Sequence, residues 1–399
     1  MYSKRVKLMQ FLRQKDIIIL SSIEWKFQWQ RHQIFACFFS QVCNKVIFVE
    51  SLAKRNPAIR DIPRIDERVI KFVKSSAKRN LLKDKNRIPE NLIIISPLVL
   101  PSTFNIFRKI NRKLFIPMLV KLIKTQGIEN PIVLNYLPTQ TSLDLIDAFK
   151  PSLVIYECVQ NFPKFPGVPK DTEMIEKKII LNADLVFTDS DFLYKKIKKI
   201  RNDVKRILPG VDFNHFQRAD KGRVQKEIST LCYFGGINER RIDFNLLNGI
   251  ASGGKFEIHM IGPVRSKIPH LSKNVIFSGE VSYQELPKYL KSFDCFILPY
   301  KVNEFTKGII PAKLFECFAT GKPIIATPLP SFYEFRDLIY IAHNADEFLD
   351  IIKNIKTLEN ESKYKKRKEI AQKNSWNSRF KEIVIYIENK RVSNTSGIS

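Results

Sequence analysis

The stretch Asp294–Pro330, DCFILPYKVNEFTKGIIPAKLFECFATGKPIIATPLP, decides the fold class of this chain. Two short apolar runs, CFIL and IIAT, stand on either side of a helical pattern. Pro311 suits the first position of a helix, because its missing N–H has no intrahelical acceptor there. Gly321 suits the position just after a helix, and the proline two residues later prevents the helix from continuing. The stretch therefore predicts a strand, a loop over 300–310, a helix over 311–320 and a second strand.

The same alternation of strand and helix continues on both sides of this unit. Residues 16–207 contain the apolar runs DIIIL, KVIFV, NLIII, PIVLN, SLVIY and ADLVF, separated by helical patterns. Residues 230–342 contain the runs TLCYF, FEIHMI, NVIFS, DCFIL, PIIAT and LIYIA. Strands that are apolar along their whole length are typical of parallel sheets covered by helices on both faces. We therefore predict an α/β fold with two Rossmann-like, doubly wound parallel-sheet domains that face a cleft.

The chain has 399 residues, which fits two domains better than one. The polar, glycine-containing passage Pro209–Arg223 interrupts the alternation, so we expect the hinge there. Near the end, apolar residues at helical spacing follow Asn374 and Ser375, either of which can cap a helix. The predicted parts are an N-terminal domain over 1–207, a second domain over 208–373, and a C-terminal helix and tail over 374–399 that crosses back to the first domain.

The chain is strongly basic, with 67 lysines and arginines against 40 aspartates and glutamates and a formal net charge of +27. This charge favours an anionic partner, such as nucleic acid, a phosphorylated substrate or an anionic membrane surface, although a solvated lysine-rich surface explains it equally well. The basic clusters lack interleaved aromatic residues and glycine-rich loops, which disfavours a nucleic-acid partner. Six cysteines without a Cys-x-x-Cys pair predict reduced thiols and a cytoplasmic location.

No apolar run approaches the roughly 18 residues that a membrane-spanning helix needs, so any membrane contact is expected to be peripheral. Residues 103–126, TFNIFRKINRKLFIPMLVKLIKTQ, are the candidate segment, because a basic amphipathic helix can lie in an anionic membrane interface. Packing against the core explains its apolar side equally well, and Pro117 is expected to interrupt the helix. The apolar residues are Phe104, Phe107, Leu114, Phe115, Met118 and Leu122, and the basic ones are Arg108, Lys109, Arg112, Lys113, Lys121 and Lys124.

The opening stretch also predicts a binding site. Its loop over 300–310 follows the carboxyl end of a strand, where open α/β sheets bind ligands. Free N–H groups and the positive end of the dipole make the start of the following helix a site for an anion such as a diphosphate. Lys313 can contact this anion, and Glu316, three residues later on the same face, can accept hydrogen bonds from both hydroxyls of a ribose. The alternative is a surface ion pair between the two side chains.

Other strand ends of the second domain carry similar turns. Glycine or proline follows three of its strands, where the backbone can approach a ligand closely. Two arginines follow the first of these turns at the expected start of a helix, where they can contact a phosphate. Four strand ends with such turns favour one shared site over four unrelated loops. The residues in question are Gly235, Gly236, Arg240, Arg241, Gly262, Pro263 and Gly279.

The order of these motifs resembles that of GT-B fold retaining glycosyltransferases of the family-four (group 1) type. Within that family, it resembles the branch that serves the biosynthesis of cell-surface polysaccharides and teichuronic-acid-like polymers. The resemblance covers nearly the whole chain. Four segments carry it: LSSIEWKFQWQRHQIFA at 20–36, LPGVDFNHF at 208–216, PAKLFECFATGKPII at 311–325 and NSWNSRF at 374–380.

This resemblance implies that the second domain binds a nucleotide-diphosphate sugar, by family habit a UDP-sugar, and that the first binds a glycan or lipid-linked acceptor. It implies sugar transfer with retention by front-face displacement, without a cofactor, a metal ion or a protein nucleophile, in the cytoplasm or on the inner face of the cell membrane. Glu316 would bind the ribose, and His32 and Glu304 would orient the acceptor or the donor sugar, or serve as structural groups. The implied ligands of the diphosphate are Lys313, Arg240 and the amides of Thr306, Lys307, Gly308 and Ile309.

Two features depart from the family pattern. Many members carry two glutamates separated by seven residues, but the position eight before Glu316 is Gly308, and Glu304 is the nearby acidic residue. Gln160 and Asn161 stand where related chains often have aspartates. A catalytically inactive GT-B protein that acts as a scaffold or partner is therefore the alternative to an enzyme.

Overall fold

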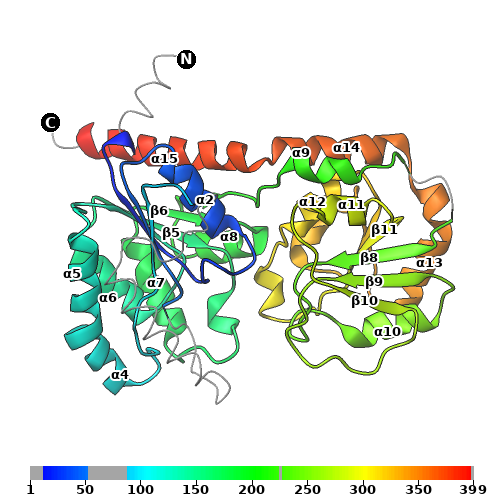
Figure 1. Ribbon diagram of the computed structural model, residues 1–399, viewed down its shortest axis with the longest axis horizontal. Helices are drawn as coiled ribbons and strands as arrows, with labels where there is room; N and C mark the ends of the chain where they lie inside the picture. Colours follow the sequence, from blue (N-terminus) through cyan, green and yellow to red (C-terminus); the bar gives the residue numbers. More distant parts are fainter. Residues whose placement is uncertain (1–11, 53–87, 224–226, 397–399) are drawn as a thin grey trace. The chain divides into compact units, whose positions relative to one another are not determined.

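The computed structural model describes residues 12–52, 88–223 and 227–396. Its contacts divide the chain into two compact units, each built on one parallel sheet with helices packed around it (Figure 1). Unit 1 contains the residues up to Asp189, Leu193–Ile207 and those from Phe380 onward, and unit 2 contains Ser190–Phe192 and Leu208–Arg379. The two parallel sheets with their helices confirm the predicted α/β fold class.

Unit 1 has a seven-stranded parallel sheet in the order β3-β2-β1-β4-β5-β6-β7. Every residue of β1, β2 and β4 is buried, as expected for strands covered on both faces. The six predicted strands are present, and a two-residue edge strand, β7, was not predicted. The strands are β1 (Ile17–Leu20), β2 (Val46–Val49), β3 (Leu92–Ile95), β4 (Ile132–Asn135), β5 (Leu153–Cys158), β6 (Leu185–Thr188) and β7 (Lys205–Arg206).

The long C-terminal helix α15 packs on helix α2 in unit 1. The ring of Phe380 lies 5.1 Å from that of Phe38 and 4.9 Å from that of Phe39, measured between centroids. Ser375 caps α15, because its hydroxyl accepts a hydrogen bond from the N–H of Ser378 at 3.2 Å. None of the described helices is long and apolar enough to cross a membrane. The helices are α2 (Arg31–Ser40), α4 (Asn105–Ile110), α5 (Ile116–Lys124), α6 (Gln140–Phe149), the short η3 (Phe162–Lys164), α7 (Thr172–Asn182), α8 (Asp191–Lys198) and α15 (Trp376–Ser396).

The segment that was predicted to break at Pro117 is a continuous helical run, so that prediction was wrong. Helix α4 passes into a π-helical turn, η2 (Asn111–Phe115), and α5 then begins one residue before Pro117. The N–H of Ile116 donates to the carbonyl oxygen of Asn111, five residues earlier, so the wider π turn just before Pro117 lets the run continue. The buried Asn111 side chain fixes the π turn, since it accepts from the N–H of Leu100 and donates to its carbonyl oxygen, both at 2.8 Å.

Unit 2 has a six-stranded parallel sheet in the order β10-β9-β8-β11-β12-β13, and all six strands were predicted. The strands are β8 (Thr230–Phe234), β9 (Glu257–Ile261), β10 (Val275–Gly279), β11 (Cys295–Leu298), β12 (Ile324–Ala326) and β13 (Tyr340–Ile341). The helices are α9 (Phe213–Phe216), η4 (Gln217–Ala219), α10 (Phe244–Ser252), α11 (Leu286–Leu290), η5 (Thr306–Gly308), α12 (Lys313–Ala319), η6 (Pro330–Phe335), α13 (Ala345–Leu358) and α14 (Glu361–Lys373).

Helix α12 is the helix that the opening stretch of sequence predicted, and it is shorter than expected. Its first residue is Lys313 and its N-cap is Ala312, so Pro311 lies before the cap instead of at the first helical position. Gly321 has a φ of 72°, which is the left-handed conformation predicted for the residue after the helix. A Cβ there would lie 2.4 Å from the ring of Tyr364. The helix therefore ends one residue before the predicted end and begins two residues after the predicted start.

Candidate functional site

The turns after β8, β9 and β10 meet at one edge of the unit 2 sheet. The N–H of Gly235 donates to the carbonyl oxygen of Ile261, and the N–H of Gly262 donates to that of Gly279, both at 2.7 Å. The φ angles of the three glycines are 116°, 134° and 74° in chain order, a region that disfavours other residues. A Cβ at Gly262 would lie 2.2 Å from the carbonyl oxygen of Gly235. The backbone is therefore left bare at the strand ends, where a ligand can approach it closely.

The ammonium group of Lys313 lies against these glycine turns. Its Nζ is 5.1 Å from the centroid of the Tyr233 ring. A Cβ added to Gly235 would lie 2.6 Å from the same Nζ atom. Burial lowers the pKa of Lys313, but the pKa is raised overall by Tyr233, Tyr300 and the carboxylate of Glu316. Lys313 is therefore a cation at neutral pH, held beside bare backbone at the carboxyl end of β8.

Glu316 lies one turn further along α12 and is half-buried. Within the described residues its carboxylate forms neither a hydrogen bond nor an ion pair, so the surface ion pair with Lys313 is not present. Burial raises the pKa of Glu316 to about 7, although Lys313 acts in the opposite direction. The carboxylate is thus an acceptor that the surrounding protein leaves unsatisfied.

The loop between β11 and α12 uses its own backbone amides, which corrects part of the prediction. The N–H groups of Thr306 and Lys307 donate to the side-chain and carbonyl oxygens of Asn303, at 3.0 and 2.9 Å. The N–H of Ile309 donates to the carbonyl oxygen of Thr306 at 3.0 Å, which leaves Gly308 as the remaining residue of the predicted set. Because three of the four predicted amides already have acceptors inside the loop, they offer no phosphate contact in this conformation.

Glu304 lies on the exposed part of the same loop. Its carboxylate forms an ion pair with Lys307, with an Nζ–Oε1 distance of 2.6 Å, and both side chains are more than one-third exposed. An ion pair of this kind contributes little to stability because water screens it. Glu304 therefore lies on the surface, paired with a neighbour three residues away.

The remaining predicted residues of unit 2 lie in or beside the turns. The carbonyl oxygen of Gly236 accepts from the Tyr233 hydroxyl at 3.1 Å, and that of Pro263 accepts from a backbone N–H at 3.0 Å. Arg240 is exposed, whereas Arg241 is half-buried with its guanidinium 5.8 Å from the centroid of a phenylalanine ring. Both arginines precede the cap of α10 instead of lying in its first turn, so that part of the prediction was wrong.

In unit 1, His32 is buried and engaged with its neighbours. Its Nε2 lies 3.1 Å from the hydroxyl of Ser22, and its ring centroid lies 3.9 Å from that of Tyr136. Gln33, the next residue, forms a capping box with Gln30 at the start of α2. This motif therefore fixes the entry into α2, and His32 is held inside unit 1 at the carboxyl end of β1.

Sequence reasoning missed a buried polar cluster beside His32. The guanidinium Nε of Arg31 lies 2.8 Å from Oε1 of Glu157, and its Nη2 donates to the carbonyl oxygen of Ile207 at 2.7 Å. Burial raises the pKa values of Glu157 and Asp189, while Arg31 acts in the opposite direction on both. The available signal was a glutamate inside the otherwise apolar strand LVIYEC. The cluster ties the start of α2 to the carboxyl end of β5.

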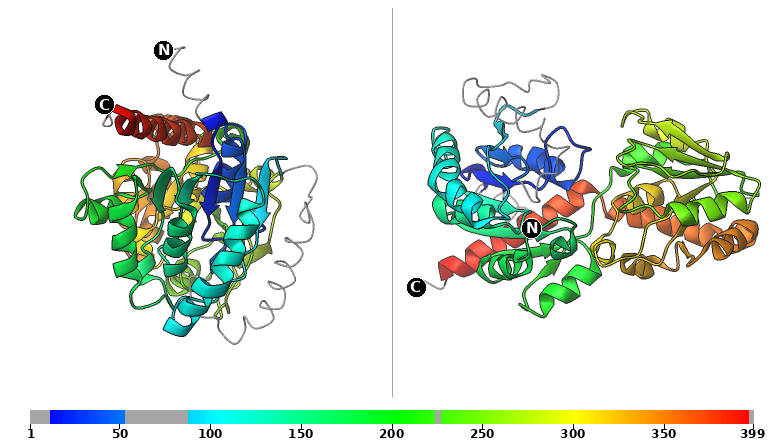
Figure 2. Two further views of the ribbon diagram at one scale, coloured as in Figure 1. Left: turned by 90° about the vertical axis from the view of Figure 1, so that its left-hand side faces the viewer. Right: turned by 90° about the horizontal axis from the view of Figure 1, so that it is seen from below.

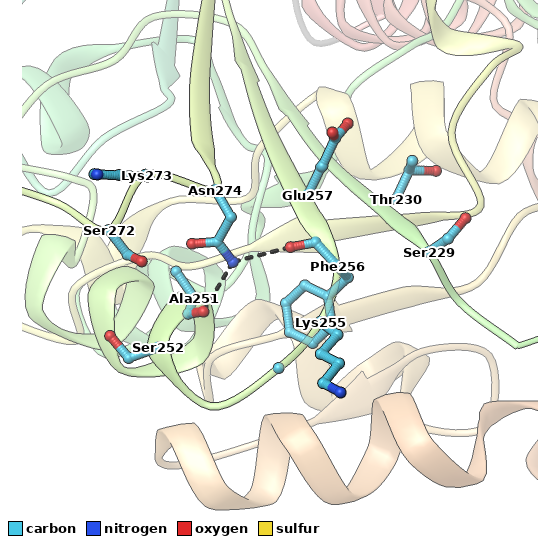
Figure 3. Close-up of a pocket in the computed structure, with 11 residues that line it drawn as sticks. Ser229, Thr230, Ala251, Ser252, Lys255, Phe256, Glu257, Ser272, Lys273 and Asn274 are labelled. Carbon is cyan, nitrogen blue, oxygen red and sulfur yellow. Dashed lines mark hydrogen bonds between the residues drawn. The ribbon is translucent and has the colours of Figure 1, made fainter.

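A hollow of about 770 Å³ opens at the amino ends of β8, β9 and β10. Figure 3 shows the residues that line it. The glycine turns lie at the other, carboxyl ends of these strands. The amide of Asn274 spans it, donating to the carbonyl oxygens of Ala251 and Phe256 at 2.8 and 2.9 Å. The hollow is lined by Ser229, Thr230, Ala251, Ser252, Gly254, Lys255, Phe256, Glu257, Ser272, Lys273 and Asn274.

In the part of the chain that the structure describes, no group of three or more His, Cys, Asp or Glu residues could hold a metal ion.

Residues 230–357 match the family model described as glycosyl transferases group 1. Over 236 residues the chain is 29% identical to the putative teichuronic acid biosynthesis glycosyltransferase TuaH of Bacillus subtilis. This match covers 53% of this chain and 58% of TuaH. Over 175 residues the chain is 27% identical to an uncharacterized 41.2 kDa protein in the cps region of Klebsiella pneumoniae. This second match covers 40% of this chain and 47% of the Klebsiella protein. The chain thus spans about half the length of the curated relatives that it matches.

The fold is similar to that of the Anabaena protein Alr3699/HepE in its complex with UDP-glucose. The TM-score is 0.64 with 9% identity, and the match covers 94% of this chain and 99% of that one. The residues that match the family model include the three glycine turns and α12. The two parallel sheets of this chain agree with the similarity to the HepE fold. Residues 230–357 therefore match the glycosyl transferases group 1 family model, within a chain that has the GT-B fold.

Proposed function

We propose that this chain transfers a sugar from a nucleotide-diphosphate sugar, a UDP-sugar, to a hydroxyl of a glycan or lipid-linked acceptor in the biosynthesis of a cell-surface polysaccharide. One observation carries the proposal: a lysine ammonium held against the bare backbone of Gly235, with the unsatisfied carboxylate of Glu316 one turn away. A diphosphate needs a cation and close backbone approach, and a ribose needs an acceptor for its two hydroxyls. These requirements meet at the carboxyl ends of the unit 2 strands.

In this proposal Lys313 acts on the leaving group. As the bond between the sugar and the diphosphate breaks, negative charge grows on the diphosphate, and a fixed ammonium stabilises that charge. The acceptor oxygen forms its bond to the sugar on the same face, and the acceptor proton passes to the departing diphosphate. The configuration is then retained, and the transfer uses no metal ion, cofactor or protein nucleophile. Because Glu304 is paired on the surface, it has no assigned role in the bond-forming step.

The relatives support the choice of donor and product class. TuaH is named as a putative glycosyltransferase of teichuronic acid biosynthesis, and HepE forms complexes with UDP and with UDP-glucose. These descriptions belong to those proteins, and they make UDP-sugars the first donors to test for this chain.

A peripheral contact with an anionic membrane surface would bring the enzyme to a lipid-linked acceptor. The segment α4–η2–α5 runs along one side of unit 1 (Figure 2) and contains no acidic residue. Its core face includes Ile116, Leu119 and Ile123, while other large apolar side chains remain exposed. Four lysines accompany them at exposed positions, which suits an anionic interface. The exposed apolar residues are Phe104, Ile106, Leu114 and Met118, which are 41–59% exposed.

The membrane proposal is tested by sedimentation with vesicles that contain anionic lipid at low salt. The double variant Leu114→Glu/Met118→Glu should reduce binding at least tenfold, because it places two carboxylates on the contact face. Leu181→Glu, which changes an exposed leucine on α7, is the control and should bind like the unmodified protein. Equal binding of all three proteins would contradict the proposal.

The enzymatic proposal is tested by incubating the protein with UDP-, GDP- and dTDP-sugars and a lipid-linked acceptor while free nucleotide is measured. We expect release of UDP that depends on the acceptor. Lys313→Met should reduce this release by at least 100-fold, since one fixed electrostatic donor is typically worth ~10²–10³ in rate. Turnover of no donor, or full turnover by Lys313→Met, would contradict the proposal.

A catalytically inactive scaffold is the second candidate, and the loop before α12 favours it. Gly308 stands where related chains carry an acidic residue, and the nearby Glu304 is paired with Lys307. A scaffold would bind a UDP-sugar and release no UDP at any acceptor concentration. Binding and product release measured on the same preparation therefore separate the two candidates.

A further inference from the structure

The ring of Tyr283, in the loop between β10 and α11, is stacked on one side and exposed. It lies parallel to the ring of His215 in α9, with centroids 4.0 Å apart and an interplanar angle of 6°. An edge of the ring contacts Phe216 at 83°, with centroids 5.9 Å apart. Tyr283 is nevertheless 46% exposed. His215 covers one face of the ring, so the opposite face is the one that a ligand can reach.

Hydrogen bonds hold this stacked pair in place. Nε2 of His215 lies 2.7 Å from the carbonyl oxygen of Tyr283, and the guanidinium of Arg218 contacts Nδ1 of the same imidazole. Asp212 caps α9 by accepting from the N–H of His215 at 3.1 Å. Burial lowers the pKa of His215, so the ring is neutral at pH 7, with the proton on Nε2 and Nδ1 accepting from Arg218. The pair is therefore a rigid, neutral aromatic surface.

Tyr283 and Glu316 belong to neighbouring elements of unit 2. Helix α9 packs against α12, the helix that carries Glu316. Burial raises the pKa of the Tyr283 phenol, and the carboxylates of Asp212 and Glu316 raise it further. The phenol and the Glu316 carboxylate therefore lie within electrostatic reach of each other, in the same unit and beside the same helix.

We propose that the exposed face of Tyr283 is the platform on which the base of the donor nucleotide stacks. The inference rests on the proposed function, in which Glu316 accepts the hydroxyls of the ribose. The base is joined directly to that ribose, so a flat aromatic ring within electrostatic reach of Glu316, stacked on the helix that packs against α12, is in the right region to receive it. Stacking on a tyrosine face requires no particular base, because every base has a π face. Tyr283 then contributes affinity for the nucleotide, while the choice among bases lies with other groups.

The test measures the dissociation constants of UDP and of inorganic pyrophosphate for four proteins by calorimetry. Tyr283→Leu keeps an apolar contact with His215 and removes the aromatic face, and it should weaken UDP binding ~5- to 150-fold, the range for loss of one base–aromatic stack. Its affinity for pyrophosphate, which has no base, should stay within about twofold. Tyr283→Phe should bind UDP like the unmodified protein. The matched control is Tyr289→Leu, which changes another exposed tyrosine, on α11.

A spectroscopic measurement separates stacking from a general loss of structure. The H5 and H6 protons of bound UDP should shift upfield in the unmodified protein and in Tyr283→Phe, because they lie over a ring. This shift should disappear in Tyr283→Leu. Unchanged UDP affinity in Tyr283→Leu, or an equal loss of pyrophosphate affinity, would overturn the platform while the donor site stands. Failure of the unmodified protein to bind UDP, GDP or dTDP would overturn the proposed function and the platform with it.

Discussion

Replacement of Glu316 by glutamine should stabilise the protein at neutral and higher pH. Burial makes ionisation of this carboxyl unfavourable and raises its pKa from 4.5 to about 7, although Lys313 acts in the opposite direction. At about 1.36 kcal/mol per unit of pKa, this change corresponds to about 3 kcal/mol of lost stability. Partial exposure screens the charge, so about 3 kcal/mol is the upper bound. Glu316→Gln keeps the shape of the side chain and removes the charge.

The sign of the pH dependence follows from proton binding. Between pH 4.5 and about 7 the folded protein holds a proton on Glu316 that the unfolded chain has lost. Stability therefore falls as the pH rises through this window, and the full loss is reached above it. The variant lacks this dependence, so the two proteins should have equal stability near pH 4.5, and the variant should be more stable at pH 8.

Urea unfolding at pH 5 and pH 8 measures this difference. The gain in unfolding free energy for Glu316→Gln should be small at pH 5 and approach about 3 kcal/mol at pH 8. Glu369→Gln, which changes an exposed glutamate on α14, is the control and should show no such difference. A variant with the same stability as the unmodified protein at both pH values would refute the reasoning, because Glu316 would then ionise without cost.

The remaining predictions concern ligand affinity and two packed positions. Affinity for UDP-glucose should rise as the pH increases from 6 to 8, because Glu316 must be ionised to accept the ribose hydroxyls, and Glu316→Gln should abolish this rise; titration calorimetry measures both. Gly262→Ala should destabilise unit 2 by at least ~2 kcal/mol in urea unfolding, since its Cβ would meet a backbone oxygen, whereas Gly222→Ala, with nothing within 4 Å, should cost less. Glu157→Ala should cost ~3–5 kcal/mol because it removes the carboxylate that pairs with the buried guanidinium of Arg31, and Arg31→Met/Glu157→Leu should recover most of that loss.

The strands were predictable because each combines an apolar run with a fixed place in the alternation of strand and helix. The edge strand β7 was not, since its two residues, Lys205 and Arg206, carry charge and resemble a loop. The glycines at 235, 262 and 321 correctly predicted tight turns. Their positive φ angles disfavour any residue with a Cβ, so glycine itself is the signal in the sequence. Local chemistry of this kind is visible in one sequence.

The polar parts of the candidate site were harder to predict because their partners are distant in sequence. His215 lies 68 residues from Tyr283, and Arg31 lies 126 residues from Glu157, so no local spacing indicates either pair. The amides of Thr306 and Ile309 were assigned to a ligand, yet the loop uses them for its own hydrogen bonds. A sequence shows which groups are present, whereas only the fold shows which of them are already satisfied.

The difference between polar groups that already have partners and those that do not is the strongest argument for the proposal that the nucleotide-sugar donor binds at α12. His32 and Glu304 were predicted as functional together with Glu316, but each of the first two has a partner in its own unit. A group that is already paired must break that contact before it binds a ligand, which reduces the affinity it can supply. Glu316 has no such contact to break among the described residues, and its raised pKa predicts that the protein loses stability by keeping it. Binding sites commonly show such a trade between stability and function, so the unsatisfied carboxylate is the residue for which a ligand accounts best.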